Sequence, residues 1–210
     1  MPDSTLLLFL ATSLLIIVSP GQDMVLVISR SIAQGRQAGV ITAAGVSVGL
    51  LGHTVLAALG LGAVLQASEL VFKIMKYLGA AYLVYLGIKA FKAPAVEFGR
   101  PGRPSGSLRV LFYQGAISNL SNPKIAVFYF AFLPQFVTSG NSYPTQTLLA
   151  LGAAFALITF TIKAPIGYSA GALSGWFRSR PRVQVWLNRI SGTVLVGLGL
   201  RLAVQSQPGN

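Results

Sequence analysis

The chain has 210 residues, of which 53% are hydrophobic and only 10% charged, and its formal net charge is +12. A soluble domain carries about 25% charged residues, so this composition places most of the chain in a lipid bilayer. Because the basic residues cluster between long apolar stretches, membrane orientation explains them better than nucleic-acid binding does.

The first apolar stretch, about 6–28, is long enough to cross a bilayer but contains the sequence Ser-Pro-Gly-Gln-Asp at 19–23. Ser followed by Pro is a typical helix N-cap and first helical residue, and Gly21 adds flexibility. We therefore expect one helix to stop near Val18 and another to start near Gln22. Inside a bilayer, such a break is tolerated only where protein or a wet cavity surrounds it.

Asp23 is the acidic residue inside this stretch, and an intramembrane carboxylate is a functional hypothesis by default. It could bind a substrate ammonium or carry a coupling proton, and a helix-capping role is the compatible alternative. The N–H groups of the restarted helix suit a carboxylate, and the carbonyls that end the preceding helix suit a cation. An amino-acid zwitterion carries both kinds of group.

The second stretch, about 40–65, contains His53, and the third covers about 70–90. A histidine titrates near neutral pH, so His53 could relay a proton. A lone histidine in an apolar helix is, however, more often a packing residue, and this alternative stays open.

The fourth stretch, about 110–137, is broken by a Ser-Asn-Pro-Lys sequence. Asn122 can cap a restarted helix in which Pro123 is the first residue. Lys124 could bind a carboxylate or pair with Asp23, and snorkelling toward the interface is its alternative role.

The fifth stretch, about 148–173, contains Lys163 shortly before a proline, and the sixth covers about 183–204. Lys163 could line a cavity or reach an interface. Asn119, just before the second break, could supply an amide to the same cavity or form a hydrogen bond between helices.

Lys and Arg are concentrated in the connections after the first, third and fifth stretches. The positive-inside rule places these connections in the cytoplasm. Both termini are therefore expected outside the cytoplasm.

The two halves of the chain resemble each other. Leu-Val-Tyr-Leu-Gly-Ile-Lys at 83–89 closes the third stretch, and Leu-Val-Gly-Leu-Gly-Leu-Arg at 195–201 closes the sixth. A Pro-, Gly- and Arg-rich linker at 93–108, expected in the cytoplasm, separates the halves 1–92 and 109–210. Three stretches per half is an odd number, so the halves run in opposite directions. The sequence therefore predicts an all-α integral membrane protein of six transmembrane helices, arranged as two inverted three-helix repeats.

Three segments also carry a family resemblance. They are Ser19-Pro20-Gly21-Gln22-Asp23 with the residues up to Gly39, Asn122-Pro123-Lys124 leading to Phe132-Leu133-Pro134-Gln135-Phe136, and the run from Leu78 to Gly87. Together they resemble the LysE/RhtB family of amino-acid exporters over nearly the whole chain. The family's first motif usually reads Pro-Gly-Pro, and Gln22 replaces the second proline here.

The resemblance implies six helices in two inverted repeats, an inner-membrane location and proton-coupled efflux of amino acids or close derivatives. It implies site residues at Pro20, Gly21, Asp23, Asn122, Pro123 and Lys124. The residues themselves add four further candidates, Gln22, Asn119, His53 and Lys163. The expected partners are an amino acid, protons and the lipid bilayer, with a homo-oligomer left open and no nucleic acid, cofactor or metal.

Other functions fit the residues less well. A metal or other ion exporter on a related fold would need Cys, His or carboxylate ligands, and the chain has no Cys, one His and four acidic residues. A membrane enzyme or electron carrier would need a Cys pair, a metal motif or a nucleophile with its base. A structural membrane protein does not need paired helix breaks with polar residues. We therefore expect a transporter and not an enzyme.

Overall fold

The computed structural model describes residues 3–19, 21–67, 69–94, 106–137, 142–178 and 180–204. All regular structure in these ranges is helical, which confirms the all-α prediction. The helices in chain order are α1 (Asp3–Val18), α2 (Gln22–Gln34), α3 (Arg36–Ala67), α4 (Glu69–Lys92), α5 (Leu108–Leu120), α6 (Pro123–Val127), α7 (Pro144–Arg178) and α8 (Pro181–Val204). After α6 the chain continues as a π-helical segment, η1 (Phe128–Phe132), and a 3-10 turn, η2 (Leu133–Phe136).

These helices cover all six predicted stretches, with α1–α2 as the first and α5 through η2 as the fourth. Among the described residues, three segments are long and apolar enough to cross a membrane: Arg36–Gly60, Pro144–Ala170 and Pro181–Val204. The pair α1–α2, bent by 50°, is a fourth if it forms one span. The chain is therefore a multi-pass membrane protein, and the count of six spans stays a prediction.

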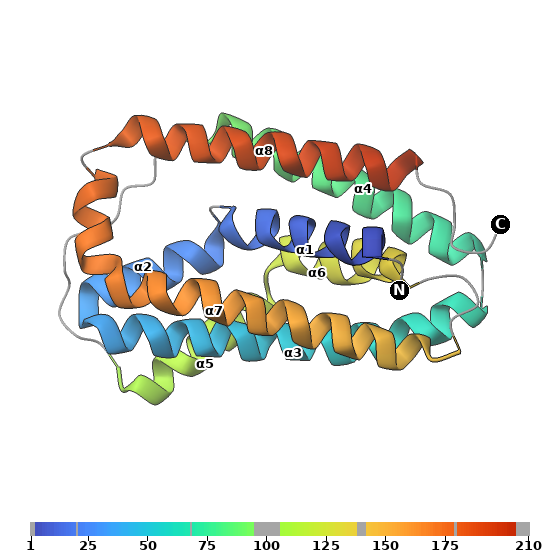
Figure 1. Ribbon diagram of the computed structural model, residues 1–210, viewed down its shortest axis with the longest axis horizontal. Helices are drawn as coiled ribbons and strands as arrows, with labels where there is room; N and C mark the ends of the chain where they lie inside the picture. Colours follow the sequence, from blue (N-terminus) through green and yellow to red (C-terminus); the bar gives the residue numbers. More distant parts are fainter. Residues whose placement is uncertain are drawn as a thin grey trace.

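Two long helix pairs frame the molecule. α3 packs along α7 and α4 packs along α8, and Figure 1 shows α1 and α6 at the level between these pairs. Gly39 of α3 faces the backbone of Gly167 in α7, and Gly87 of α4 faces Gly192 in α8. Lipid gives helices no hydrophobic drive to associate, so close backbone packing at small residues supplies much of the attraction.

The first helix break lies where the sequence predicts it, because α1 ends at Val18 and α2 begins at Gln22. The N-cap is Gly21, which has extended backbone and no side-chain capping bond. The prediction of a cap at Ser19 is therefore wrong, since the carbonyl of Gly21 accepts the first hydrogen bond of α2. Pro20 lies outside the described residues.

The second break follows the predicted capping pattern in full. Asn122 is the N-cap of α6, its side-chain oxygen accepts the N–H of Lys124 at 3.1 Å, and Pro123 is the first helical residue. The aromatic rings that follow anchor this segment against α7, since Phe128 stacks on Phe155 with centroids 4.6 Å apart. Both rings are buried.

The predicted linker at 93–108 is described only at its two ends. Asn188 of α8 donates hydrogen bonds to the carbonyls of Ala93 and Pro94, at 3.4 and 3.0 Å. These bonds attach the start of the linker to the second half of the chain.

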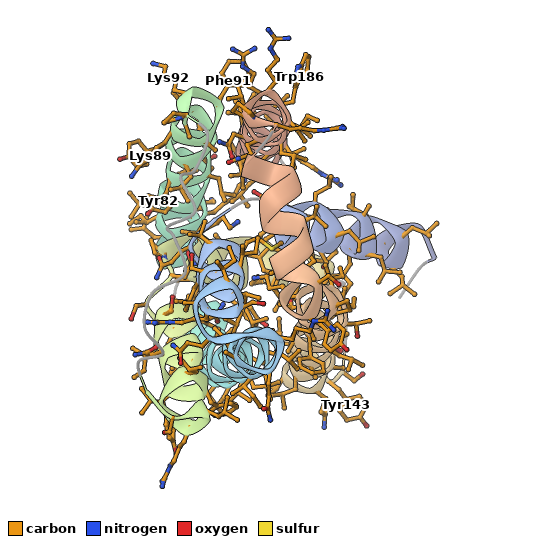
Figure 2. The ribbon with its side chains drawn as sticks, turned by 90° about the vertical axis from the view of Figure 1, so that its left-hand side faces the viewer. Tyr82, Lys89, Phe91, Lys92, Tyr143 and Trp186 are labelled. Atoms are coloured by element: carbon orange, nitrogen blue, oxygen red, sulfur yellow. The ribbon has the colours of Figure 1, made fainter. Side chains whose placement is uncertain are left out.

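Many large apolar side chains point outward, among them Leu59, Leu78 and Leu157. Large contiguous apolar surfaces are rare on soluble monomers, and a bilayer solvates them. At the end of α4, Figure 2 shows Lys89 and Lys92 projecting away from the helices.

Candidate functional site

Asp23 lies in the first turn of α2 and is only 3% exposed. Its carboxylate accepts hydrogen bonds from Nδ2 of Asn119 at 2.8 Å and from Nδ2 of Asn122 at 3.3 Å. Nζ of Lys163, on α7, lies 3.3 Å from Oδ2 of Asp23, and Lys163 is 5% exposed. Buried charges persist when they are paired and hydrogen-bonded, as they are here. Asp23 thus connects the first break, the second break and α7.

Asp23 pairs with Lys163 and not with Lys124, contrary to the pairing considered from the sequence. Nζ of Lys124 instead donates to the carbonyl oxygen of Ile16 at 3.4 Å. The last carbonyls of a helix lack intrahelical partners and favour a nearby cation, which explains why the ammonium lies at the end of α1. A Cβ added at Gly21 would lie 3.2 Å from the same Nζ, so glycine leaves space for the lysine.

Gln22 connects the two halves of the chain beside this network. Its Nε2 donates to the hydroxyl of Ser118 at 2.9 Å and to the carbonyl of Ser118 at 3.1 Å. The amide that replaces the family's second proline therefore ties α2 to α5. The sequence carries no signal for Ser118, since an isolated serine in a membrane helix is common.

His53 of α3 is buried, and its Nε2 lies 3.2 Å from the backbone carbonyl oxygen of Asn119. Through Asn119 the histidine is connected to the hydrogen bonds around Asp23. Its other ring nitrogen, Nδ1, is buried and has no hydrogen-bond partner among the described residues. The ring stacks on Tyr129 with centroids 5.5 Å apart. The hydroxyl of Tyr129 in turn lies 3.2 Å from Oγ1 of Thr54.

A small pocket beside the ion pair brings the charged groups together. It is lined by Asp23, Lys124 and Lys163, by the polar side chains of Ser19, Gln22, Asn122 and Thr159, by Gly21, and by Ile16, Ile17, Met24, Leu50, Ile125 and Phe155. Its free volume of about 10 Å³ is room for about one water molecule. This volume is too small for a ligand as large as an amino acid.

The structure brings most of the predicted site residues to this pocket. Six of them line it: Gly21, Gln22, Asp23, Asn122, Lys124 and Lys163. Asn119 donates to the carboxylate of Asp23, and His53 contacts the backbone carbonyl of Asn119. Pro123 is exposed and serves as the first residue of α6. Thr159 was not predicted, and its hydroxyl donates within its own helix to the carbonyl of Phe155. Across the described ranges, no three His, Cys, Asp or Glu side chains gather to hold a metal.

Comparisons with known proteins match nearly the whole chain. The family model described as LysE type translocator matches residues 14–206. A homoserine/homoserine lactone efflux protein of Salmonella typhimurium is 32% identical over 196 residues, which are 93% of this chain and 94% of the relative. A leucine efflux protein of Salmonella choleraesuis is 27% identical over 199 residues, 93% of this chain and 92% of the relative. The uncharacterized membrane protein YrhP of Bacillus subtilis is 31% identical over 206 residues, 94% of this chain and 97% of the relative. No solved structure matches the chain.

Proposed function

This chain belongs to the family of LysE type translocators, and we propose that it is a secondary active transporter that exports amino acids or close derivatives from the cytoplasm by proton antiport. The observation that carries the proposal is a pocket between two helix breaks that holds one carboxylate and two ammonium groups. An amino-acid zwitterion presents the complementary pair of charges. The relatives named as homoserine and leucine efflux proteins support an amino-acid cargo.

The two ends of the zwitterion have separate partners in the pocket. Asp23 suits the substrate ammonium, because a carboxylate accepts charge-assisted hydrogen bonds. Lys124 suits the substrate carboxylate, and the first N–H groups of α2 add to it because the N-cap, Gly21, has no side chain to cap them. The apolar wall formed by Leu50 and Phe155 faces the same space and is suited to an uncharged side chain.

The proposed transporter has six transmembrane helices in two inverted three-helix repeats, and helix contacts support this arrangement. Gly87 of α4 abuts Gly192 and Val196 of α8, and Gly199 of α8 abuts Ala80 and Val84 of α4. Ala80 and Val84 precede Gly87 by the same intervals by which Gly192 and Val196 precede Gly199. Equal intervals of this kind are those of two antiparallel helices, and inverted halves require their third helices to run in opposite directions.

The α3–α7 pair supports the same repeat. Gly39 meets Gly167, and Thr54 meets Gly152. The interval from Gly39 to Thr54 equals that from Gly152 to Gly167, so α3 and α7 also pack antiparallel, as the second helices of inverted halves would.

We place the protein in the bacterial inner membrane with both termini outside the cytoplasm. The positive-inside rule supports this orientation. An arginine lies at the start of each of three helices: Arg36 in α3, Arg109 in α5 and Arg182 in α8. These three helix starts lie at the same end of the molecule, on the left in Figure 1. The start of α1 lies toward the other end.

A metal or other ion exporter is the alternative, and it is not favoured. The efflux proteins among the relatives have amino-acid names. The pocket carries two cationic side chains against one carboxylate, and this balance repels a metal cation.

The test is transport by purified protein in proteoliposomes. Labelled amino acids are offered one at a time outside vesicles with an acidic lumen, and accumulation is compared with protein-free vesicles and with vesicles that hold no pH gradient. We expect at least one neutral amino acid, with L-homoserine and L-leucine tested first, to accumulate only with protein and gradient together. Failure of every amino acid to move would reject the proposal.

A further inference from the structure

We propose that Lys163 is the proton carrier of this antiport, because its ammonium occupies the place on Asp23 that a substrate ammonium would take. When the substrate binds Asp23, Lys163 loses its counter-ion and releases a proton. The inference rests on the proposed function and adds a mechanism of coupling to it. It also assigns the proton to a lysine and not to the carboxylate.

The three neighbours of Asp23 all offer hydrogen-bond donors, and this arrangement favours the ionised form of its carboxyl group. Asn122 must present Nδ2 to Asp23, because its Oδ1 is already occupied by the backbone N–H of Lys124. Asn119 presents Nδ2 as well, and Lys163 donates from its ammonium. All three neighbours are donors, so the carboxylate acts as an acceptor only. In this state the proton therefore lies on Lys163.

The balance of charge decides what happens when a zwitterion enters. The pocket holds one negative charge, on Asp23, and two positive charges, on Lys124 and Lys163. A zwitterion adds no net charge, but its ammonium binds Asp23 and its carboxylate binds Lys124. Lys163 would then be a buried cation without a partner, and such a cation is far less stable than the neutral amine.

The resulting cycle balances protons and charge. Facing the cytoplasm, the pocket takes up one zwitterion, and the Lys163 ammonium becomes an amine as its proton passes to water on that side. Facing outward, the substrate leaves, and the amine takes a proton from outside and pairs with Asp23 again. One amino acid moves out for each proton that moves in.

The surrounding groups explain why Lys163 carries the proton. Its anionic partner among the described residues is Asp23, and its side chain is only 6% exposed. Lys124 donates to the carbonyl of Ile16 and is only partly buried, so it does not depend on Asp23 for a partner. His53 reaches Asp23 only through Asn119, and Tyr129 lies behind the histidine.

The test counts the protons released when substrate binds. Purified protein is titrated with L-homoserine and with L-leucine by calorimetry, in two buffers whose protonation heats differ. We expect the wild type to release about one proton per bound amino acid, so its apparent affinity rises about tenfold per pH unit where Lys163 is protonated in the free protein. Lys163→Arg should release none, because a guanidinium does not give up its proton.

Two further substitutions serve as comparisons. Lys89→Arg is the matched control, because Lys89 projects outward from the end of α4. Lys124→Arg should keep the count of about one proton, since Lys124 stays charged in the proposed cycle. Thermal unfolding of each variant in detergent checks that it is folded.

Each outcome has a distinct meaning. Binding by the wild type without proton release would overturn the inference and leave export intact, as expected if both lysines share the substrate carboxylate. Release by Lys163→Arg, or its loss in Lys124→Arg alone, would also overturn it. Absence of binding by either amino acid, together with failure of the transport screen, would overturn the proposed function and the inference with it.

Discussion

Asn122 donates its side-chain amide to Asp23 at 3.3 Å while the oxygen of the same amide caps α6. One planar group thus fixes the start of the second half-helix and holds the carboxylate at the first break. A movement of α6 must therefore either carry Asp23 with it or break this hydrogen bond. The two breaks behave as one site for this reason.

Asn122→Ala removes both the cap and the hydrogen bond to the carboxylate. We expect it to lower the free energy of unfolding by about 2 kcal/mol and to reduce transport. Ser107→Ala is the control, because Ser107 is the N-cap of α5 but makes no side-chain capping bond. It should change stability by less than about 0.5 kcal/mol. Equal losses in thermal unfolding for the two variants would contradict the role of the cap.

Asp23→Asn should abolish export while the protein remains in the membrane. It leaves Lys163 as a buried cation without its partner, which costs about 3–5 kcal/mol of stability. The double variant Asp23→Asn with Lys163→Met should recover most of the stability but no transport. Efflux from cells loaded with dipeptides and thermal unfolding in detergent measure the two effects separately. Undiminished efflux by Asp23→Asn would remove Asp23 from the mechanism.

Gly192→Ala tests the close crossing of α4 and α8. The added methyl group would meet the backbone of Gly87 and Phe91, so we expect a loss of about 1–3 kcal/mol. Gly197→Ala on the same helix would place its new Cβ where no atom of the described part of the chain lies within 4 Å. It should be neutral or stabilise by up to about 1 kcal/mol through helix propensity. Similar melting shifts for both variants would show that the crossing is looser than described.

Gln22→Cys combined with Ser118→Cys tests whether α2 and α5 must separate during transport. The chain contains no native cysteine, so a short thiol crosslinker acts only at the introduced pair. Because the native side chains join the two helices at 2.9 Å, the crosslink should form readily and stop transport until it is cleaved. Each single cysteine variant, treated alike, is the control. Full transport by the crosslinked protein would show that these helices stay together throughout the cycle.

The proposed orientation predicts the behaviour of a reporter fused after Asn210. An enzyme that is active only in the periplasm should be active there, whereas the same enzyme inserted near Pro101 should be inactive. A cytoplasm-active reporter at the two positions should give the opposite pattern. An inactive periplasmic reporter after Asn210 at normal expression would reverse the orientation.

The helices and one helix start could be predicted from the sequence because they depend on residues that are neighbours in the chain. The apolar stretches predicted the helices, because a bilayer requires the backbone of each spanning segment to pair within itself. Asn122 and Pro123 predicted the start of α6, since a cap and its first residue are adjacent in the chain. The prediction of a cap at Ser19 was wrong, because a residue type that favours the N-cap position does not by itself fix where a helix begins. The N-cap of α2 is Gly21.

The helical class, the two breaks and the residue types that could carry charge into the membrane thus follow from the order of amino acids alone. The choice of the cation that meets Asp23 depends on how the helices pack. Lys124 and Lys163 are equivalent candidates by charge, and both lie far from Asp23 in the chain. Packing of α7 against α2 brings Lys163 to the carboxylate of Asp23, whereas Lys124 donates to a carbonyl at the end of α1. Charge acts over a few ångströms, so its partner depends on helix packing and not on sequence distance.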